Sequence, residues 1–138
     1  SDLADPGAWE FWTGEAWATT PDTLGTLVPA EVGVSQILSV FERGGWWYAV
    51  SKRGDVFGTD LVVWKAPSPE GPFVAGPVVA SLPSDEAGVL RYMPLAHPAL
   101  PSAPGAIVVS YSRNVSSMKT LLDDPSVYRP VFLEIPLP

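Results

Sequence analysis

The one histidine of the chain has the widest chemical range of any of its side chains. His97 lies between Leu95-Ala96 and Pro98, where we expect an inner strand to begin. A neutral or protonated imidazole there could contact a hydroxyl group or stabilise a neighbouring carboxylate. A lone histidine is also often a structural residue whose hydrogen bonds are satisfied within the protein. The chain has no cysteine and no second histidine, so we expect neither a metal site nor a cofactor.

A second polar group lies at the end of the strongest predicted strand. The run Ser110-Tyr-Ser-Arg-Asn114 puts Tyr111 within that strand and Arg113 and Asn114 at its mouth. These side chains could contact a ligand, or they could cap the strand end with local hydrogen bonds. Tyr92, in the segment before His97, is a further candidate binding residue.

Most of the fifteen acidic residues fall in predicted turns or at hairpin ends. Such positions favour solvated loop charge, so the sequence assigns no catalytic residue. The acids concerned are Asp22, Glu42, Asp55, Asp60, Glu70, Asp85, Glu86, Asp123 and Asp124.

Tryptophan offers a second route to ligand binding, because flat aromatic faces stack on sugar rings. Trp46 and Trp47 are adjacent, so in a strand they point to opposite faces of the sheet. A sheet that packs on both faces explains this pair without a ligand. The same packing interpretation is favoured for Trp9, Trp12 and Trp17, which belong to a predicted aromatic hairpin over residues 8–18.

The elements that position these groups are predicted to be short strands. Gly44-Gly45 indicates a tight hairpin, and proline and glycine clusters separate the other apolar runs. The stretch that begins at Ser35 then resembles one four-stranded antiparallel unit, whose first three strands lie within residues 35–73. Its strands are expected over Ser35–Arg43, Trp46–Ser51, Leu61–Lys65 and Phe73–Leu82, with the last at a sheet edge because of Gly76 and Pro77.

Later in the chain we expect strands over Gly105–Ser112 and Tyr128–Ile135, and one helical turn at Ser117–Leu122. The resulting fold class is all-β, with antiparallel four-stranded blades of a partial β-propeller. Residues 1–30 form the end of one blade, 31–83 a full blade and 84–138 most of the next. Closed propellers have roughly four to eight blades, so a second chain or an N-terminal fragment is expected to complete the ring. A self-contained β-sandwich is the alternative.

The composition of the chain excludes two classes of binding partner. The chain has 138 residues and a net charge of −7, which argues against binding to the negatively charged backbone of a nucleic acid. No apolar run is long enough to span a membrane. No signal-peptide pattern is present in the sequence.

Several stretches together resemble five-bladed β-propeller proteins of unassigned function related to glycoside hydrolases, the arabinanase- and levansucrase-like propellers. These stretches are Leu3–Gly14, Val34–Val40, Ala66–Phe73, His97–Pro98, Val109–Asn114 and Tyr128–Phe132. The resemblance implies that the chain is the C-terminal portion of a secreted bacterial carbohydrate-active propeller of the glycoside hydrolase type, whose site is completed by N-terminal blades. The alternatives are a non-catalytic propeller that binds glycans or proteins and a sandwich-type binding domain.

The resemblance also points to one further strand. Where related hydrolases place an inner-strand acid, this chain has Ser35, Gln36 and Ser39. Gln36 could hydrogen-bond a sugar hydroxyl, but it cannot act as a catalytic acid. The candidate carbohydrate-binding residues are therefore His97, Gln36, Ser35, Tyr92, Tyr111, Arg113 and Asn114.

Overall fold

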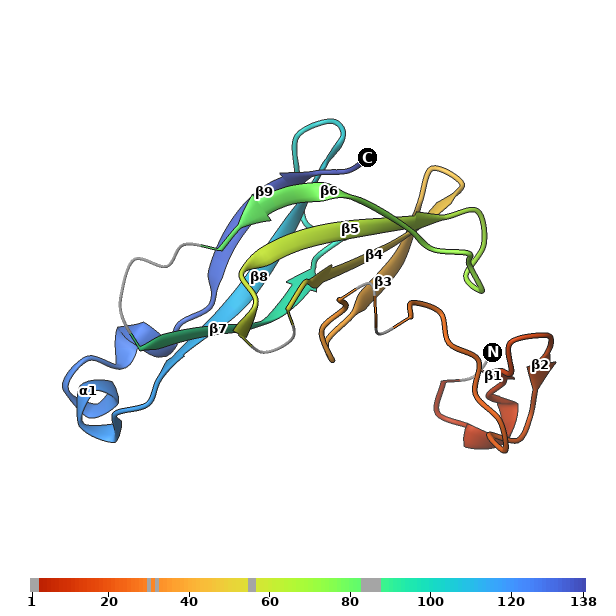
Figure 1. Cartoon of the computed structure of the whole chain (residues 1–138), viewed down its shortest axis with the longest axis horizontal. Helices are drawn as coiled ribbons and strands as arrows, with labels where there is room; N and C mark the ends of the chain where they lie inside the picture. Colours follow the sequence, from red (N-terminus) through yellow and green to blue (C-terminus); the bar gives the residue numbers. More distant parts are fainter. Residues whose placement is uncertain (1–2, 30, 32, 55–56, 83–87) are drawn as a thin grey trace.

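The computed structural model describes residues 3–29, 31, 33–54, 57–82 and 88–138. The chain is mostly β, with three antiparallel sheets of two, four and three strands in which chain neighbours pair (Figure 1). None of the helices in these residues is long and apolar enough to cross a membrane.

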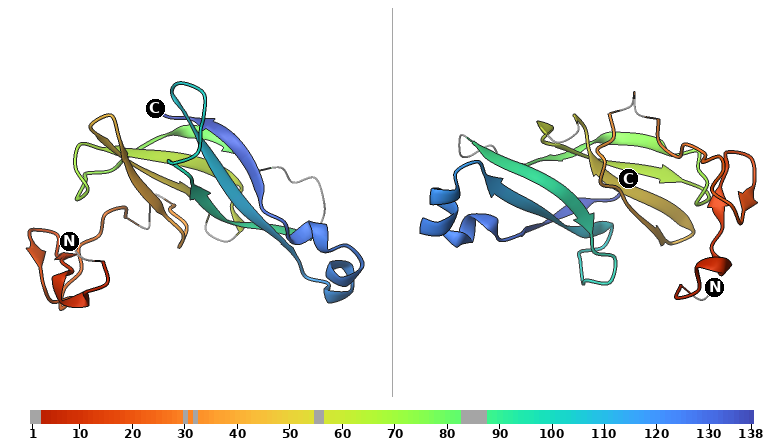
Figure 2. Two further views of the ribbon diagram at one scale, coloured as in Figure 1. Left: turned by 180° about the vertical axis from the view of Figure 1, so that it is seen from behind. Right: turned by 90° about the horizontal axis from the view of Figure 1, so that it is seen from below.

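The N-terminal element is a small hairpin. A 3₁₀ turn, η1 (Pro6–Ala8), precedes β1 (Phe11–Trp12) and β2 (Trp17–Ala18). This confirms the aromatic hairpin predicted over residues 8–18. Figures 1 and 2 show it beside the larger sheets, at the opposite end of the molecule from α1 (Met118–Asp123).

The four-stranded sheet is a simple meander. It consists of β3 (Ser39–Arg43), β4 (Trp46–Lys52), β5 (Asp60–Ala66) and β6 (Val74–Ser81). Gly44 and Gly45 have φ angles of 63° and 79°, the left-handed pair that a type I′ hairpin turn requires. The predicted strand order and the edge position of the fourth strand are therefore confirmed.

The three-stranded sheet is a second meander. It consists of β7 (Val89–Ala96), β8 (Ala106–Val115) and β9 (Val131–Pro136). α1 and a 3₁₀ turn, η4 (Pro125–Tyr128), lie between β8 and β9. α1 confirms the predicted helical turn, whereas β9 begins three residues later than expected because η4 takes up the preceding residues.

The two larger sheets share one hydrophobic core. Alternating residues of β4 and β5, Val50 and Val63 among them, pack against Ile107 and Val109 of β8 and Ile135 of β9. All of these side chains are almost completely buried. The opposite face of the four-stranded sheet is covered by Val28 and by Leu27, Val34 and Leu38, which pack with Ala49, Val62 and Trp64. Burial on both faces explains why β5 is an almost unbroken apolar run.

The three-stranded sheet has one face in this core and one face away from it. Residues paired directly across an antiparallel sheet lie on the same face. The outer face therefore carries Leu90 with Asn114, Leu95 with Ser110, and Ser110 with Phe132. Leu90, Leu95 and Phe132 remain 38%, 38% and 55% exposed.

Two local predictions were wrong. The strand expected from Ser35 begins only at Ser39, because Ser35 to Leu38 cross the face of the sheet instead of pairing within it. His97 does not begin an inner strand either, since it follows the end of β7, which was not predicted. β7 tolerates Pro94 because it is an edge strand and because the register shifts between Tyr92 and Leu95.

Candidate functional site

A pocket of about 450 Å³ lies where the two larger sheets meet. We call it the edge pocket, since β7 is the edge strand that borders it. Its volume falls in the range of small-molecule sites. The lining residues are Ser35, Gln36, Ile37, Lys52, Leu90, Tyr92, Met93 and Asn114.

The edge pocket brings together four of the seven candidate residues. Ser35 and Gln36 come from the segment before β3, Tyr92 from β7 and Asn114 from β8. Ser35 is 8% exposed, while Gln36 is exposed. These residues are far apart in the sequence, so only the fold makes them neighbours.

Two hydrogen bonds hold the wall that carries Gln36. The Ser51 hydroxyl donates to the Ile37 carbonyl at 2.6 Å, which fixes the segment to β4. The Ala96 backbone N–H donates to the Ser39 hydroxyl at 3.1 Å, which links β7 to β3. The amide of Gln36 therefore projects from a segment tied to both sheets.

Lys52 also lines the edge pocket and was not among the residues singled out from the sequence. Its side chain is completely buried, and Nζ donates to the carbonyls of Gly58 at 2.9 Å and Arg91 at 2.8 Å. The bond to Arg91 links β4 to β7. Its position directly after an apolar strand was the one available signal, because a lysine there continues the alternation into the interior.

Met93 has a left-handed backbone, with φ 53°. Such a conformation is unfavourable for a residue with a side chain, and it often accompanies functional sites. The residue lies within the register shift between Tyr92 and Leu95. The irregularity turns the β7 edge at the point where Tyr92 and Met93 line the pocket.

Tyr92 has a perturbed hydroxyl group. A hydrogen bond with the Tyr128 side chain, together with burial, raises the pKa of Tyr92 above its ordinary value of 10.0, and an interaction with Asn114 opposes this rise. The neutral phenol is therefore favoured, so Tyr92 can both donate and accept hydrogen bonds at neutral pH. Asn114 is held in turn by its own Oδ1, which accepts from the Val115 backbone N–H at 2.8 Å.

The other candidate residues lie elsewhere. His97 Nε2 is 2.7 Å from the Ser110 hydroxyl, and its ring contacts Phe132 at 5.6 Å between centroids. Ser110 precedes Asn114 by four residues on β8, roughly 13 Å along a strand. His97 thus lies on the same outer face as Asn114 but does not line the edge pocket.

Tyr111 and Arg113 face the other side of the three-stranded sheet. Tyr111 is 4% exposed in the shared core. Arg113 is paired with Arg91 across the sheet and donates from Nη2 to the Ser126 carbonyl at 3.3 Å. Neither residue lines the edge pocket.

Five of the acidic residues singled out from the sequence have partners within the chain. Glu42 accepts from the Gly45 N–H, Asp60 from the Ser81 hydroxyl and Glu70 from the Trp17 indole. Asp123 pairs with Lys119, while Asp124 caps η4. Asp55, Asp85 and Glu86 lie outside the described residues. Within the described part of the chain, no three acidic or histidine side chains gather into a potential metal site.

A family model described as a domain of unknown function, DUF5005, matches residues 1–136. The chain belongs to the DUF5005 family. No curated protein matches it, and neither does any solved structure. Membership in DUF5005 carries no activity by itself, so a function for this chain has to be argued from the edge pocket and the surfaces around it.

Proposed function

We propose that the chain binds a carbohydrate in the edge pocket. The observation that carries this proposal is the convergence of the Gln36 and Asn114 side-chain amides with the Tyr92 phenol around one cavity. Amides and hydroxyls can each donate and accept, which matches the hydroxyl groups of a sugar. Leu90 and Met93 supply an apolar wall, as small-molecule sites usually require.

The lining of the edge pocket favours binding of a carbohydrate over its hydrolysis by this chain acting alone. Glycoside hydrolysis usually needs two carboxyl groups on either side of the bond that breaks. None of the described residues that line the edge pocket is acidic. A sugar held there would be contacted by neutral groups and by the Lys52 stem, without a general acid.

A carbohydrate-active enzyme is the second candidate. In this version the chain is the C-terminal portion of a secreted bacterial five-bladed propeller, similar to glycoside hydrolases, and the catalytic acids come from N-terminal blades or a second chain. Two observations support a propeller. Both larger sheets are sequential meanders packed face to face, and the outer face of the three-stranded sheet exposes Leu90, Leu95 and Phe132. A further blade would cover such a face.

Carbohydrate binding is tested by calorimetric titration of the folded chain with arabino- and fructo-oligosaccharides, after a screen on a glycan array. Gln36→Ala and Asn114→Ala each remove hydrogen bonds to the ligand. A net loss of about 1 kcal/mol for each bond corresponds to about fivefold weaker binding. Thr20→Ala, an exposed polar side chain outside the pocket, and His97→Ala are controls that should bind like the wild type.

Two results would contradict the proposal. One is the lack of binding to every glycan on the array. The other is a glycan affinity that survives both pocket variants but falls with His97→Ala. Release of reducing sugar by the purified chain would instead favour the enzyme and would contradict the requirement for further blades.

A further inference from the structure

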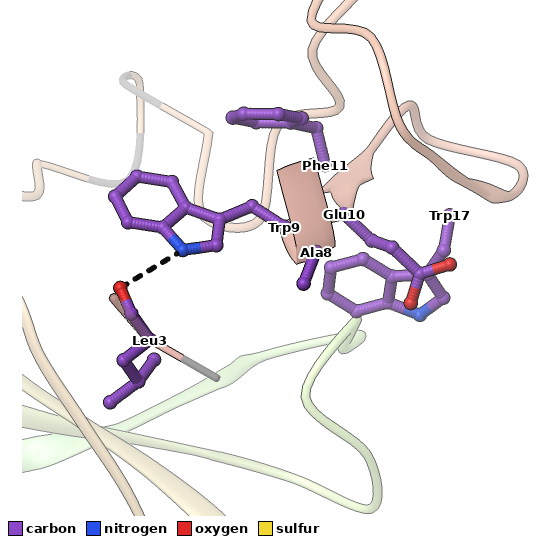
Figure 3. A pocket seen from close by; sticks show the side chains of 6 residues that line it. All are labelled: Leu3, Ala8, Trp9, Glu10, Phe11 and Trp17. Atoms are coloured by element: carbon purple, nitrogen blue, oxygen red, sulfur yellow. Dashed lines mark hydrogen bonds between the residues drawn. The ribbon is translucent and has the colours of Figure 1, made fainter. Parts of the chain in front are cut away.

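A second pocket lies on the N-terminal hairpin, away from the edge pocket. It has a volume of about 520 Å³ and is lined by Leu3, Ala8, Trp9, Glu10, Phe11 and Trp17. We call it the hairpin pocket. Three aromatic side chains and one carboxylate therefore surround a single hollow (Figure 3).

The tryptophans of this pocket keep their ring faces accessible. Trp9 and Trp17 remain 46% and 45% exposed. Trp9 donates from Nε1 to the Leu3 carbonyl at 3.3 Å, as the dashed line in Figure 3 shows. Trp17 donates from Nε1 to a Glu70 carboxylate oxygen at 2.6 Å. Both rings are thus fixed through their edges, and the Trp17 ring also contacts the Trp12 ring at 5.7 Å between centroids. The part of each ring that stays exposed is available to a ligand.

Carboxylates lie beside these rings. Glu10 lines the hairpin pocket together with Trp9 and Trp17 (Figure 3). The indole hydrogen bond from Trp17 keeps the pKa of Glu70 below its ordinary value of 4.5. Glu70 is therefore ionised at neutral pH, and an indole that donates to an anion is polarised toward a more negative ring.

The hairpin also belongs to the acidic part of the chain. Residues 1–42 contain seven acidic residues and no basic one, whereas the rest contains eight of each. The whole net charge of −7 therefore falls in this N-terminal segment. Its acids are Asp2, Asp5, Glu10, Glu15, Asp22, Glu31 and Glu42.

We propose that the hairpin pocket binds an arginine or lysine side chain from a basic segment of another polypeptide. A guanidinium or ammonium group is attracted to the face of a tryptophan ring, and Glu10 adds a direct charge partner. The acids spread over the rest of the segment extend this attraction to further basic residues of the same partner. A single small cation would not need so long an acidic segment, and a neutral sugar would gain nothing from it.

The hairpin is held in place by contacts within the chain before any partner binds. The Gly25 backbone N–H donates to the Trp12 carbonyl at 2.7 Å, and a side chain at Gly25 would collide with the backbone of Gly14. The bond from Trp17 to Glu70 fixes the hairpin to the turn between β5 and β6. Little ordering of the hairpin is then required on binding.

The test is a titration of the full chain with a capped peptide of arginine, glycine and serine residues, followed by calorimetry and tryptophan fluorescence. Trp9→Leu removes the ring face and Glu10→Gln removes the charge. Each should weaken binding about two- to fivefold. Trp46→Leu and Glu134→Gln are matched controls, since Trp46 is 44% exposed on β4 and Glu134 is exposed on β9. Both controls should bind like the wild type.

Several outcomes would overturn the proposal. The first is equal binding of a peptide with glutamate in place of arginine. The second is an affinity that Trp9→Leu and Glu10→Gln leave unchanged, because binding would then be a diffuse charge effect. Equal affinity for free arginine amide would refute a polypeptide partner. Tighter binding of a neutral oligosaccharide, lost with Trp9→Leu, would reassign the pocket to sugar stacking.

Discussion

Replacement of Ile107 by alanine tests whether the two larger sheets fold as one unit. Ile107 lies on β8, is completely buried, and contributes to the core that the sheets share. The change removes roughly three methylene equivalents at about 0.8 kcal/mol each, or about 2.4 kcal/mol of transfer free energy. A cavity adds to this, so the free energy of unfolding should fall by about 3 to 4 kcal/mol. For a chain of this size, Tm should drop by about 10 to 15 °C.

The positions of the tryptophans make the assay decisive. All six lie at or before residue 64, in the N-terminal hairpin and the four-stranded sheet. Tryptophan fluorescence therefore does not report directly on β7, β8 or β9, whereas far-UV circular dichroism reports on every strand. If the sheets are coupled, Ile107→Ala lowers both midpoints equally, and Leu122→Ala on exposed α1 changes neither. A fluorescence midpoint that stays at its wild-type value would refute the shared core as a cooperative unit.

Three further predictions concern local structure. The pKa of Tyr92 is raised in the folded protein, so its stabilising contribution is present at neutral pH and is lost as the pH rises through that raised pKa. In an ultraviolet titration Tyr92 should ionise above pH 10.0, and Tyr128→Phe should return its pKa toward 10.0. Gly58→Ala would put a methyl group onto a backbone carbonyl, so the free energy of unfolding in urea should fall by about 1 to 3 kcal/mol. The lowered pKa of Glu70 depends first on the Trp17 indole, so Trp17→Phe should raise it toward 4.5 in an NMR titration, and an unchanged value would contradict the hydrogen bond.

The strands that follow from the sequence are those with local signals. Gly44-Gly45 specifies a turn by its own backbone preference, and β4, β5 and β8 are rich in residues that favour strands. β7 lacks such a signal, because Pro94 removes a ladder hydrogen bond and Met93 takes a left-handed conformation. Its pairing with β8 and its packing against the four-stranded sheet maintain it, and these are contacts between distant parts of the chain.

The candidate site, like β7, could be predicted from the sequence only in part. Residue type alone favoured His97, which the fold places against Ser110 and Phe132 on the outer face of the three-stranded sheet. Residue type also favoured Tyr111, which packs in the core because of its position in the strand alternation. Gln36 and Asn114 meet only because the segment before β3 crosses to the edge of β7. No local pattern encodes that approach.

The two proposed sites differ in a way that separates them experimentally. The edge pocket is lined by neutral groups and by Lys52, which is buried, whereas the hairpin pocket lies in the segment that carries the entire net charge of −7. Salt screens exposed charges over roughly 10 Å at 0.1 M and more strongly above that concentration. Glycan binding in the edge pocket should therefore be almost insensitive to salt, while binding of a basic peptide at the hairpin should weaken steeply. Since the sites share no lining residue, Gln36→Ala should leave peptide affinity unchanged and Glu10→Gln should leave glycan affinity unchanged. A variant that alters both affinities would mean that one surface accounts for both activities.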